Sequence, residues 1–417
     1  MSNLIHVCYQ GLDQPVKVGR MFYEKGVSHF EYHADFLSRN LNISPFKLAI
    51  TSDMQTAKRS PFNGLFGVFN DSLPDGWGLL LMDKWFRQQG MPLADITPLT
   101  RLTYIGERGL GALSYHPEIT KNEGSAFSAV DIQQLARESI AIYQGQTSSV
   151  LAELTQAGVP SGGARPKVLL GINAKDEAVV GDENLPEGYT RWLAKFPTGD
   201  TYEKRCEGKV EYVYSCLAKD AGIAFPDTRL IKGDAGHAYF AVERFDRTVE
   251  GNKVHMHSLA GLIDADFRIP DCDYEVLMKV TNALTKSHKE NIEVFRRLVF
   301  NVVMGNRDDH TKNFCFLMNN KGLWRSSPAY DLTYNLGING NHSMSVAGEG
   351  KNIRFDHLAK IAGLGSINKK CMREIIEQVS ESALRWKAVI KNYDVPSEIV
   401  GDIEQHIHKQ TALIRPS

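Results

Sequence analysis

The stretch GNRDDHTKN, residues 305–313, places two aspartates, a histidine, a lysine and an asparagine between two apolar segments. The segment before it, HKENIEVFRRLVFNVVM, is apolar on nearly all sides of a helix, which predicts a buried helix. The segment after it, FCFLMNNKGLWRSSPAYDL, is typical of a hairpin that turns at NNKG and ends at Asp331. Polar groups crowded at the end of a buried helix need a reason other than packing.

The spacing within and after this stretch predicts phosphoryl transfer. Asn313 follows Asp308 by five residues, and Asp331 follows Asp308 by 23 residues across the hairpin. Protein kinases place a catalytic base and two metal ligands in the same order, as D-x-x-x-x-N, a hairpin and an aspartate. We therefore interpret Asp308 as the base that takes the acceptor proton, Asn313 and Asp331 as Mg²⁺ ligands, and Lys312 as a contact to the transferred phosphate.

The two other ionisable residues of the loop have no assigned role at this stage. His310 suits a structural histidine as well as a functional one. Asp309 is expected to face solvent or to cap the loop, because the five-residue step to the asparagine starts from its neighbour.

A phosphate-binding loop is expected upstream, in VPSGGARPK, residues 159–167. Its consecutive small residues could present backbone N–H groups as an anion nest, with Lys167 beyond them. The segment lacks the G-K-[ST] ending of a Walker A loop and the G-x-G-x-x-G of protein kinases. A simple turn explains Gly162 and Gly163 equally well.

Lys195 stands inside the apolar strand LAKFP and is expected to meet an anion, because burying an unpaired charge is costly. The predicted partner is Glu211 in the amphipathic helix that follows, as in the Lys–Glu pair of kinases. A lysine that protects an edge strand is the structural alternative. The segment AVERFDR, 241–247, lies where a kinase hinge receives adenine through its backbone, although a plain strand and turn fits it as well.

Composition places the chain among soluble globular proteins. It has 417 residues, of which 42% are hydrophobic and 23% charged, and a net charge of −1, so no general attraction to nucleic acid or acidic membranes is predicted. Its six cysteines form no C-x-x-C pair, which favours reduced thiols over disulfides or a zinc site. We find no signal-peptide pattern and no apolar run long enough to span a membrane, so a cytoplasmic location is expected.

Three parts are expected along the chain. Residues 1–117 predict a β-rich module with one or two helices, in which 101–115 reads as a glycine-rich turn that leads into a strand. Residues 118–250 predict two helices followed by two hairpins, which would form a nucleotide-binding lobe. Residues 251–417 predict a mostly helical catalytic lobe, in which Pro396 separates two amphipathic helices.

Taken together, these motifs resemble the HipA-type serine/threonine kinase toxins of bacterial toxin–antitoxin systems. The segments that carry the resemblance are FNDSLPDGWG (69–78), IGERGLGAL (105–113), GGARPK (162–167), LAKFP (193–197), VERFDR (242–247), GNRDDHTKN (305–313) and PAYDL (328–332). The resemblance implies an α+β, two-lobed, protein-kinase-like fold of the phosphatidylinositol-kinase branch. An N-terminal β-rich module and an all-helical C-terminal part would complete it.

The same resemblance implies an activity and partners. Members use ATP and Mg²⁺, and they arrest growth by phosphorylating an aminoacyl-tRNA synthetase on serine. They pair with a small helix-turn-helix antitoxin (HipB-like) that binds operator DNA, so DNA would be contacted only through the antitoxin. No membrane partner is implied.

Carried onto this chain, the resemblance makes Asp308 the proton acceptor and Asn313 and Asp331 the metal ligands. The nucleotide-binding residues that it implies are Gly162, Gly163, Ala164, Arg165, Lys167, Lys195, Glu211, Glu243, Arg244, Phe245, His310, Tyr330 and Asp331. The best-known members autophosphorylate a serine at the start of the phosphate loop, which ejects the loop. Pro160 aligns with that serine here, so the neighbouring Ser161 is the candidate for autophosphorylation.

Two alternatives remain open at this point. Asp308, Asp309, His310 and Asp331 could form a metal-dependent phosphohydrolase or nuclease site, but the upstream loop and the strand lysine would then have no role. An inactive kinase-like co-repressor is the other alternative, in which the basic segment 351–370 would contact DNA phosphates. A solvated charged face is the simpler interpretation of that segment.

Overall fold

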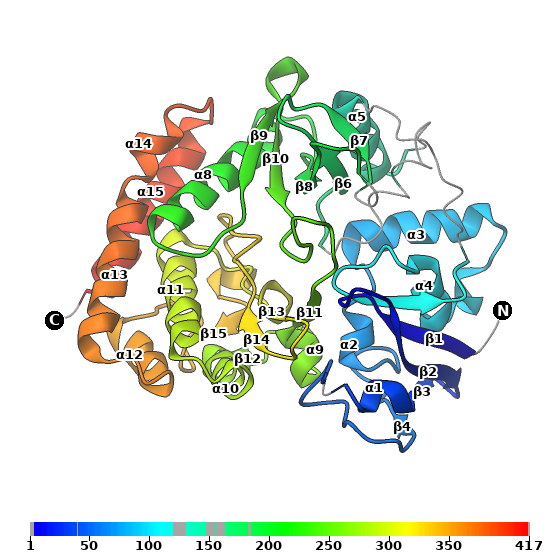
Figure 1. Cartoon of the computed structure of the whole chain (residues 1–417). Helices are drawn as coiled ribbons and strands as arrows, with labels where there is room; N and C mark the ends of the chain where they lie inside the picture. The colour runs from blue at the N-terminus through cyan, green and yellow to red at the C-terminus, as the bar shows by residue number, and fades with distance from the viewer. Residues whose placement is uncertain are drawn as a thin grey trace.

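The computed structural model describes residues 4–39, 41–119, 131–146, 154, 163–181 and 185–415. Three parts follow one another in space as in sequence: an N-terminal sheet in blue, a second sheet in green, and helices from yellow to red (Figure 1). The predicted α+β composition is confirmed. Among the described residues, no helix is long and apolar enough to cross a membrane.

The N-terminal part is built on a five-stranded antiparallel sheet in the order β4-β3-β2-β1-β5. Its elements are β1 (Leu4–Tyr9), β2 (Val16–Glu24), β3 (Val27–Tyr32), α1 (Ala34–Leu37), β4 (Gln55–Thr56), α2 (Gly67–Asn70), α3 (Gly76–Gln88), α4 (Pro98–Ile105) and β5 (Leu113–His116). Every second side chain of β1 and β3 is buried, as the alternating sequence predicts. That face packs on the rings of Phe36 and Phe69.

One prediction for this part is wrong. Residues 101–115 are predicted as a turn and a strand, but 101–105 belong to the helix α4, and the strand begins at Leu113. Thr97 caps the helix by accepting the N–H of Thr100, and Pro98 lies in the first turn, where its missing N–H costs nothing. These start signals precede the glycines and determine the local structure.

The second sheet is also antiparallel, in the order β7-β6-β8-β10-β9. The elements here are α5 (Ile132–Tyr143), β6 (Lys167–Ile172), β7 (Ala178–Val180), β8 (Thr190–Lys195), α7 (Tyr202–Arg205), α8 (Glu207–Asp220), β9 (Thr228–Lys232) and β10 (Ala238–Glu243). Both predicted hairpins are confirmed. Of the two predicted helices, the first is α5, and the second lies outside the described residues except for Leu154.

One face of this sheet packs on α3 and α5. Val168 and Leu170 of β6 and Trp192 of β8 share a buried core with Trp77 and Leu81 of α3. The sheet therefore shares its core with a helix of the N-terminal part. The boundaries predicted at residues 117 and 250 remain predictions.

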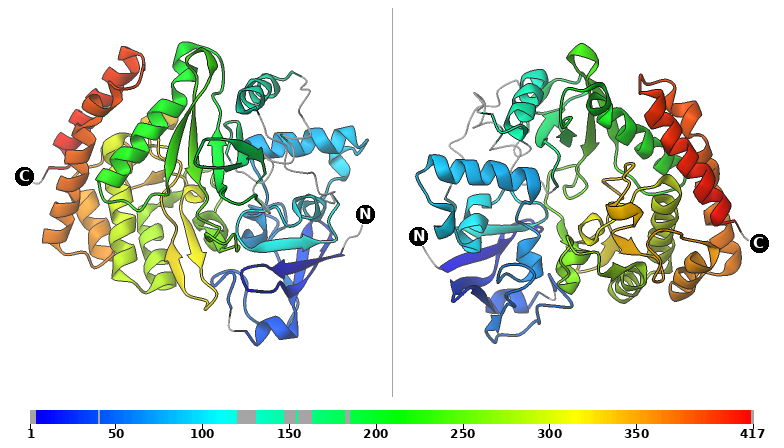
Figure 2. Two further views of the ribbon diagram at one scale, coloured as in Figure 1. Left: turned by 45° about the horizontal axis from the view of Figure 1, so that its top comes forward. Right: turned by 180° about the vertical axis from the view of Figure 1, so that it is seen from behind.

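The C-terminal part is mostly helical. It contains β11 (His255–Ser258), α9 (Leu259–Ile263), β12 (Cys272–Asp273), α10 (Tyr274–Thr285), α11 (His288–Met304), β13 (Cys315–Met318), β14 (Trp324–Ser326), β15 (Met344–Ser345), α12 (Phe355–Leu364), α13 (Lys369–Leu384), α14 (Trp386–Ile390) and α15 (Ser397–Leu413). The predicted buried helix is α11, which α10, α13 and α15 surround. The predicted hairpin is β13–β14, and the helix predicted before Pro396 is divided at Arg385. Both views of Figure 2 show α13 to α15 on the side farthest from the N-terminal sheet.

Asp246 joins the N-terminal part to the end of β10. Its carboxylate is buried and accepts hydrogen bonds of 2.6–2.9 Å from Arg244, Arg247 and the backbone N–H of Gly111. Arg247 also donates to the carbonyl oxygens of Gly109 and Gly111. Burial alone would raise the pKa of Asp246, but the two guanidinium groups and the hydrogen bonds hold that pKa well below its ordinary range.

Replacing Asp246 with Asn is expected to lower the free energy of unfolding by about 3–5 kcal/mol at neutral pH, because two buried guanidinium groups lose their counter-charge. The folded-state pKa lies below the unfolded value. The carboxylate's contribution is therefore complete above the unfolded pKa, about 4, and is lost as the pH falls toward the folded pKa. Urea unfolding of both proteins at about pH 7 and about pH 3 measures the difference.

The exposed Asp13 offers a matched control: Asp13→Asn should change the free energy of unfolding by less than about 0.5 kcal/mol. A difference between wild type and Asp246→Asn that is as large in acid as at neutral pH would contradict this account.

Candidate active site

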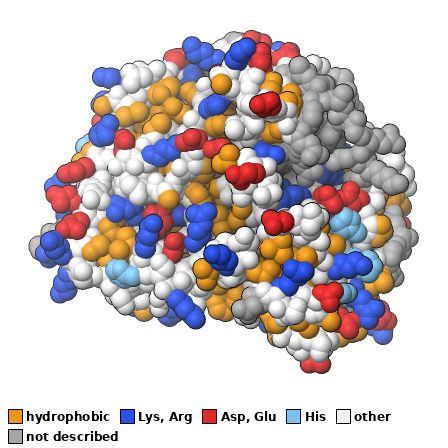
Figure 3. Space-filling view, viewed as in Figure 1, with side chains coloured by type: hydrophobic (Ala, Val, Ile, Leu, Met, Phe, Trp, Pro, Cys, Tyr) orange, Lys and Arg blue, Asp and Glu red, His pale blue; other side chains and the backbone are white. Residues whose placement is uncertain are grey.

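The second sheet packs on α3 and α5 with one face, and its other face borders a cavity of about 910 Å³. Side chains alternate along a strand, so the residues between those that pack on α3 point the other way. The side chains that line the cavity from this face are Lys167, Leu169, Leu193, Lys195, Phe240 and Val242. Figure 3 shows the surface hollowed near its centre, with hydrophobic and Lys or Arg side chains around the hollow. The cavity thus has an apolar wall with two lysines at one end.

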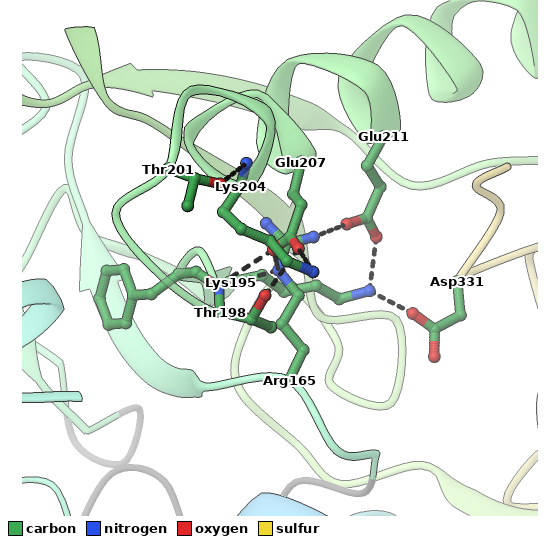
Figure 4. A network of polar contacts seen from close by, with 9 residues as sticks. Arg165, Lys195, Thr198, Thr201, Lys204, Glu207, Glu211 and Asp331 are labelled. Atoms are coloured by element: carbon green, nitrogen blue, oxygen red, sulfur yellow. Dashed lines mark hydrogen bonds and ion pairs between the residues drawn. The ribbon is translucent and has the colours of Figure 1, made fainter. Parts of the chain in front are cut away.

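The predicted partnership of Lys195 and Glu211 is present. Both side chains are buried, and Lys195 Nζ lies 2.5 Å from Glu211 Oε1 (Figure 4). Lys195 also donates to Asp331, which arrives from the segment after β14. Burial alone would lower the pKa of Lys195, but Asp331 and Glu211 outweigh it and raise that pKa. The ammonium group therefore joins the sheet, α8 and the C-terminal part.

Arg165 braces this pair rather than pointing freely into the cavity. Its Nη1 lies 2.7 Å from Glu211 Oε2, and its Nε donates to the carbonyl oxygen of Phe196 at 2.8 Å (Figure 4). Glu207 lies 3.6 Å from the same guanidinium group. In this arrangement, Arg165 holds the loop before β6 against α8.

Lys167 and Gly163 approach each other closely. Lys167 is buried, and a Cβ on Gly163 would lie 2.5 Å from its Nζ, while the φ of Gly163 is +91°. Only glycine suits this position. Burial lowers the pKa of Lys167, although Asp331 opposes the shift. The predicted loop residues Ser161 and Gly162 lie outside the described residues.

The loop after α11 presents Asp308 to the cavity. Its side chain is 54% exposed, and the side-chain amide of Asn313 donates to its backbone oxygen at 2.7 Å. Partial burial raises the pKa of Asp308. His310, whose Nε2 lies 3.9 Å away, acts to lower the pKa, and the carboxylates of Asp331 and Asp309 act to raise it. A carboxyl with a raised pKa is better matched to proton transfer near neutral pH.

The expectation that Asp309 faces solvent is wrong. Its side chain is fully buried and accepts hydrogen bonds from Tyr274 Oη at 2.7 Å, His342 Nδ1 at 2.8 Å and the N–H of Ser343 at 2.9 Å. Three donors compensate a buried carboxylate for its lost water. The two adjacent aspartates therefore point to opposite sides of the loop, and Asp309 anchors it.

Asn313 and Asp331 supply the oxygen donors that Mg²⁺ prefers. One carboxylate oxygen of Asp331 is engaged by Lys195, and the other has no hydrogen-bond partner among the residues that the structure describes. The nearby lysines hold the pKa of Asp331 well below its ordinary range, against the effect of burial, so the carboxylate is charged. Its backbone is left-handed, with a φ of +56°, which aspartate tolerates better than most residues. The donor set fits a hard divalent cation.

Two aromatic rings also line the cavity. The rings of Phe245 and Tyr330 lie 5.5 Å apart, and Tyr330 Oη donates to the carbonyl oxygen of Lys312 at 2.6 Å. The backbone N–H groups of Glu243 and Arg244 are already engaged by other carbonyl oxygens. Burial and Asp227 raise the pKa of Glu243. The side chain of Arg244 is held by its aspartate partner described above.

Every described residue that the sequence analysis assigned to the site lines this one cavity. These residues are Gly163, Ala164, Arg165, Lys167, Lys195, Glu211, Glu243, Arg244, Phe245, Asp308, His310, Lys312, Asn313, Tyr330 and Asp331. The set of carboxylates and histidine considered for a hydrolase does not converge: within the described ranges, Asp308, Asp309, His310 and Asp331 bring no three metal-ligating atoms within 4.8 Å of one another.

Asp75 is a site residue that sequence reasoning missed. It precedes α3, and its Oδ2 accepts a hydrogen bond from Lys312 Nζ at 2.8 Å, while its Oδ1 accepts the N–H of Gly163. Next to it, Trp77 donates its backbone N–H to Gly163 and its indole N–H to the carbonyl oxygen of Lys167, both at 2.9 Å. Burial alone would raise the pKa of Asp75, but Lys312 and the Gly163 N–H lower it.

The signal for Asp75 lay in FNDSLPDGWG, where an aspartate directly precedes a glycine and an amphipathic helix. Nothing in that segment predicts that Asp75 contacts residues far away in sequence. The N-terminal part thus contributes a carboxylate that contacts both the loop before β6, at Gly163, and the loop 305–313, at Lys312.

Replacing Asp75 with Ala removes the acceptor of the Gly163 N–H. Amide hydrogen exchange in the segment 163–167 should accelerate by about 10- to 100-fold, because a hydrogen bond to a charged group contributes about 1.5–3 kcal/mol. Mass spectrometry of the exchanged protein measures this rate, with Asp13→Ala as the control. Unchanged exchange in Asp75→Ala would show that the carboxylate does not hold the loop.

Comparisons with known proteins bear on both ends of the chain. The model of the HipA N-terminal domain matches residues 9–116, and that of the HipA-like C-terminal domain matches residues 159–386. A protein of Sinorhizobium fredii named "Putative kinase Y4dM" is 27% identical over 278 residues, which is 58% of this chain and 66% of that protein. A "Putative kinase" of Haemophilus influenzae is 27% identical over 190 residues, 42% of this chain and 53% of that protein. The chain thus spans about two thirds of the first relative and about half of the second.

A solved structure matches nearly the whole chain. It is HipA of Shewanella oneidensis, determined in a complex with HipB and its operator DNA. The TM-score is 0.70 at 16% identity, and the match covers 98% of this chain and 97% of that one. Such a likeness shows the fold, so the predicted two-lobed, kinase-like fold is confirmed. Because the two family models match residues 9–116 and 159–386, the chain belongs to the HipA family.

Proposed function

We propose that this chain is an ATP-dependent protein kinase that transfers the γ-phosphate to a serine or threonine. The observation that carries the proposal is the meeting of Lys195, Glu211, Asp308, Asn313 and Asp331 in one cavity. These residues follow the kinase order along the chain, and the structure is kinase-like. The names of the two relatives agree with the proposal.

Each residue of this set has a proposed role. Asp308 orients the acceptor hydroxyl and takes its proton, a role that suits its half-exposed carboxyl and raised pKa. Asn313 and Asp331 hold Mg²⁺, which neutralises charge on the phosphates when it is bound. Lys195 and Lys312 contact the phosphates, and Glu211 keeps the first of these lysines in place.

The cavity suits a nucleotide. Its volume of about 910 Å³ is within the range of ligand sites. Leu169, Leu193 and Val242 offer an apolar surface for a flat base, and the rings of Phe245 and Tyr330 add to the apolar lining. Lys167 and the loop from Gly163 onward provide cationic and N–H groups, although the rest of that loop lies outside the described residues.

The hydrolase alternative receives less support. It needs Asp309 as a metal ligand, and this carboxylate is turned away from the cavity and fully hydrogen-bonded. It also leaves the buried Lys195–Glu211 pair without a task. Loss of activity, as in a pure co-repressor, has no support because each expected catalytic residue is present.

We further propose a toxin role within a toxin–antitoxin pair. The support is membership of the HipA family and the likeness to a protein solved with HipB and operator DNA. A small helix-turn-helix antitoxin would be the partner and would carry the contact to operator DNA, which agrees with a net charge of −1. The proposed target is a serine of a translation-related protein, in the first place an aminoacyl-tRNA synthetase. Ser161 remains the candidate for autophosphorylation.

The test of the kinase proposal is phosphorylation of a cell lysate with γ-labelled ATP and Mg²⁺. Asp308→Asn should lower the rate of protein labelling by about 100- to 10,000-fold, because it removes the general base. Asp13→Asn should label at the wild-type rate. Equal labelling of the same band by wild type and Asp308→Asn would make the catalytic assignment wrong, and release of free phosphate without labelled protein would favour a hydrolase.

A second prediction concerns growth. Expression of the wild-type chain in a bacterial host should arrest growth, and Asp308→Asn at the same expression level should not, because arrest requires phosphate transfer. Co-expression of the cognate antitoxin should restore growth. The measurements are growth curves together with immunoblots for protein level. Arrest by Asp308→Asn would show that toxicity is independent of catalysis.

A further inference from the structure

Four hydrophobic side chains lie on two segments that flank Asp308 at the mouth of the cavity. We call Phe267, Ile269, Leu336 and Ile338 the apolar rim. Ile269, Leu336 and Ile338 are 56%, 64% and 75% exposed. Phe267 and Ile338 line the cavity itself. Large apolar side chains that gather in water beside a polar opening are typical of interaction sites.

The backbone fixes the first segment of the rim beside the catalytic loop. Asn335 forms a parallel bridge with Asn306, and the N–H of Arg307 donates to the carbonyl oxygen of Asn335 at 3.3 Å. The N–H of Ser343 donates to the carbonyl oxygen of Arg307 at 3.0 Å. Both ends of the segment 335–343 are therefore tied to the residue that immediately precedes the proposed base.

The turn that presents Leu336 and Ile338 is built tightly. Gly337 has a φ of +66°, and a Cβ there would lie 2.0 Å from the carbonyl oxygen of Asn341 and 2.9 Å from Cβ of Arg307. Glycine is required at this position. The two apolar side chains are thus held in solvent by a defined turn, so their exposure is a property of the fold.

The second segment of the rim contacts the residues that follow Asp308. The Phe267 ring centroid is 5.1 Å from that of His310 and 4.7 Å from Nζ of Lys312. Ile269 follows two residues later and is exposed. The two segments of the rim therefore contact the residues just before and just after Asp308, so a chain whose hydroxyl reaches this carboxylate passes close to apolar side chains.

Basic side chains accompany the rim. The guanidinium carbon of Arg268 is 4.5 Å from the Phe267 ring centroid, and this arginine is 63% exposed, with one partner, Asp266, at 3.5 Å. Nη1 of Arg307 lies 3.2 Å from the carbonyl oxygen of Leu336. A partner that covers the rim therefore meets positive charge next to apolar surface.

We infer that the apolar rim docks an extended segment of the protein substrate, with a bulky apolar side chain next to the accepting hydroxyl and an acidic side chain beyond it. The inference rests on the proposed kinase function. The apolar side chain would pack on the apolar rim, and the acidic one would meet Arg268 or Arg307. Specificity then depends in part on Ile269 and Leu336, which do not line the nucleotide cavity.

The test uses the full-length chain with Leu336 and Ile269 both replaced by Ser. Neither residue lines the cavity, so binding of a fluorescent ATP analogue should be unchanged. Labelling of the lysate protein that wild type phosphorylates should fall by about 10- to 100-fold. With that protein purified, KM should rise by a similar factor while kcat changes little, because docking is lost and the chemistry is kept.

The chain offers a matched control in Leu323, which is also 64% exposed but lies in the β13–β14 turn. Leu323→Ser should label the substrate at the wild-type rate, and the conservative Leu336→Ile should keep most of the wild-type rate. As a test of the charge, Arg268→Glu should raise KM for the same substrate.

The outcomes separate this inference from the proposed function. Wild-type labelling by the Leu336→Ser, Ile269→Ser double variant would overturn the docking site and leave the kinase assignment intact. A change in oligomeric state on size-exclusion chromatography would overturn it as well, because the rim would then cover a second copy of the chain. If wild type labels no protein although it binds ATP, the proposed function fails and this inference fails with it.

Discussion

The buried ammonium group of Lys195 is the constraint on which the rest of the structure depends. A lysine at the end of an apolar strand is tolerated only when carboxylates meet it, and here Glu211 and Asp331 do so from two different parts of the chain. Satisfying one charge therefore fixes the position of α8 against the second sheet and of the segment after β14 against both. The arrangement of the proposed phosphate and metal contacts is a consequence of neutralising this group.

The N-terminal part adds a second constraint of the same kind. Asp75 is buried between Lys312 and the N–H of Gly163, so it links the loop 305–313 to the loop that precedes β6. Because α3 also shares a core with the second sheet, this carboxylate cannot move independently of the sheet. The N-terminal module is therefore a structural component of the site, and its packing determines where two of the proposed phosphate contacts lie.

How much of this could be predicted from the sequence depends on the distance over which each residue acts. Lys195 and Glu211 were predicted because a charge in an apolar strand demands a partner, and an amphipathic helix 16 residues on supplied one. Asp75 and Lys312 are 237 residues apart, and no periodicity or motif connects them. The start of α4 was missed because the glycines after it gave a stronger local signal than its cap. Local patterns thus predicted most helices and strands and the order of the site residues along the chain. The contacts between segments that are far apart in sequence required the structure.

The adjacent Asp308 and Asp309 show why residue type alone could not assign roles. Asp309 faces inward, where three donors fix it, and Asn313 holds the backbone oxygen of Asp308 from the other side. The loop is thus anchored by the buried Asp309 and by the half-buried Asn313, while the carboxylate of Asp308 stays half exposed. A proposed base must be rigid in position and yet accessible to a macromolecular substrate, and these two demands conflict in a single free loop. Dividing them between neighbouring aspartates resolves the conflict, because Asp309 fixes the loop and leaves Asp308 accessible.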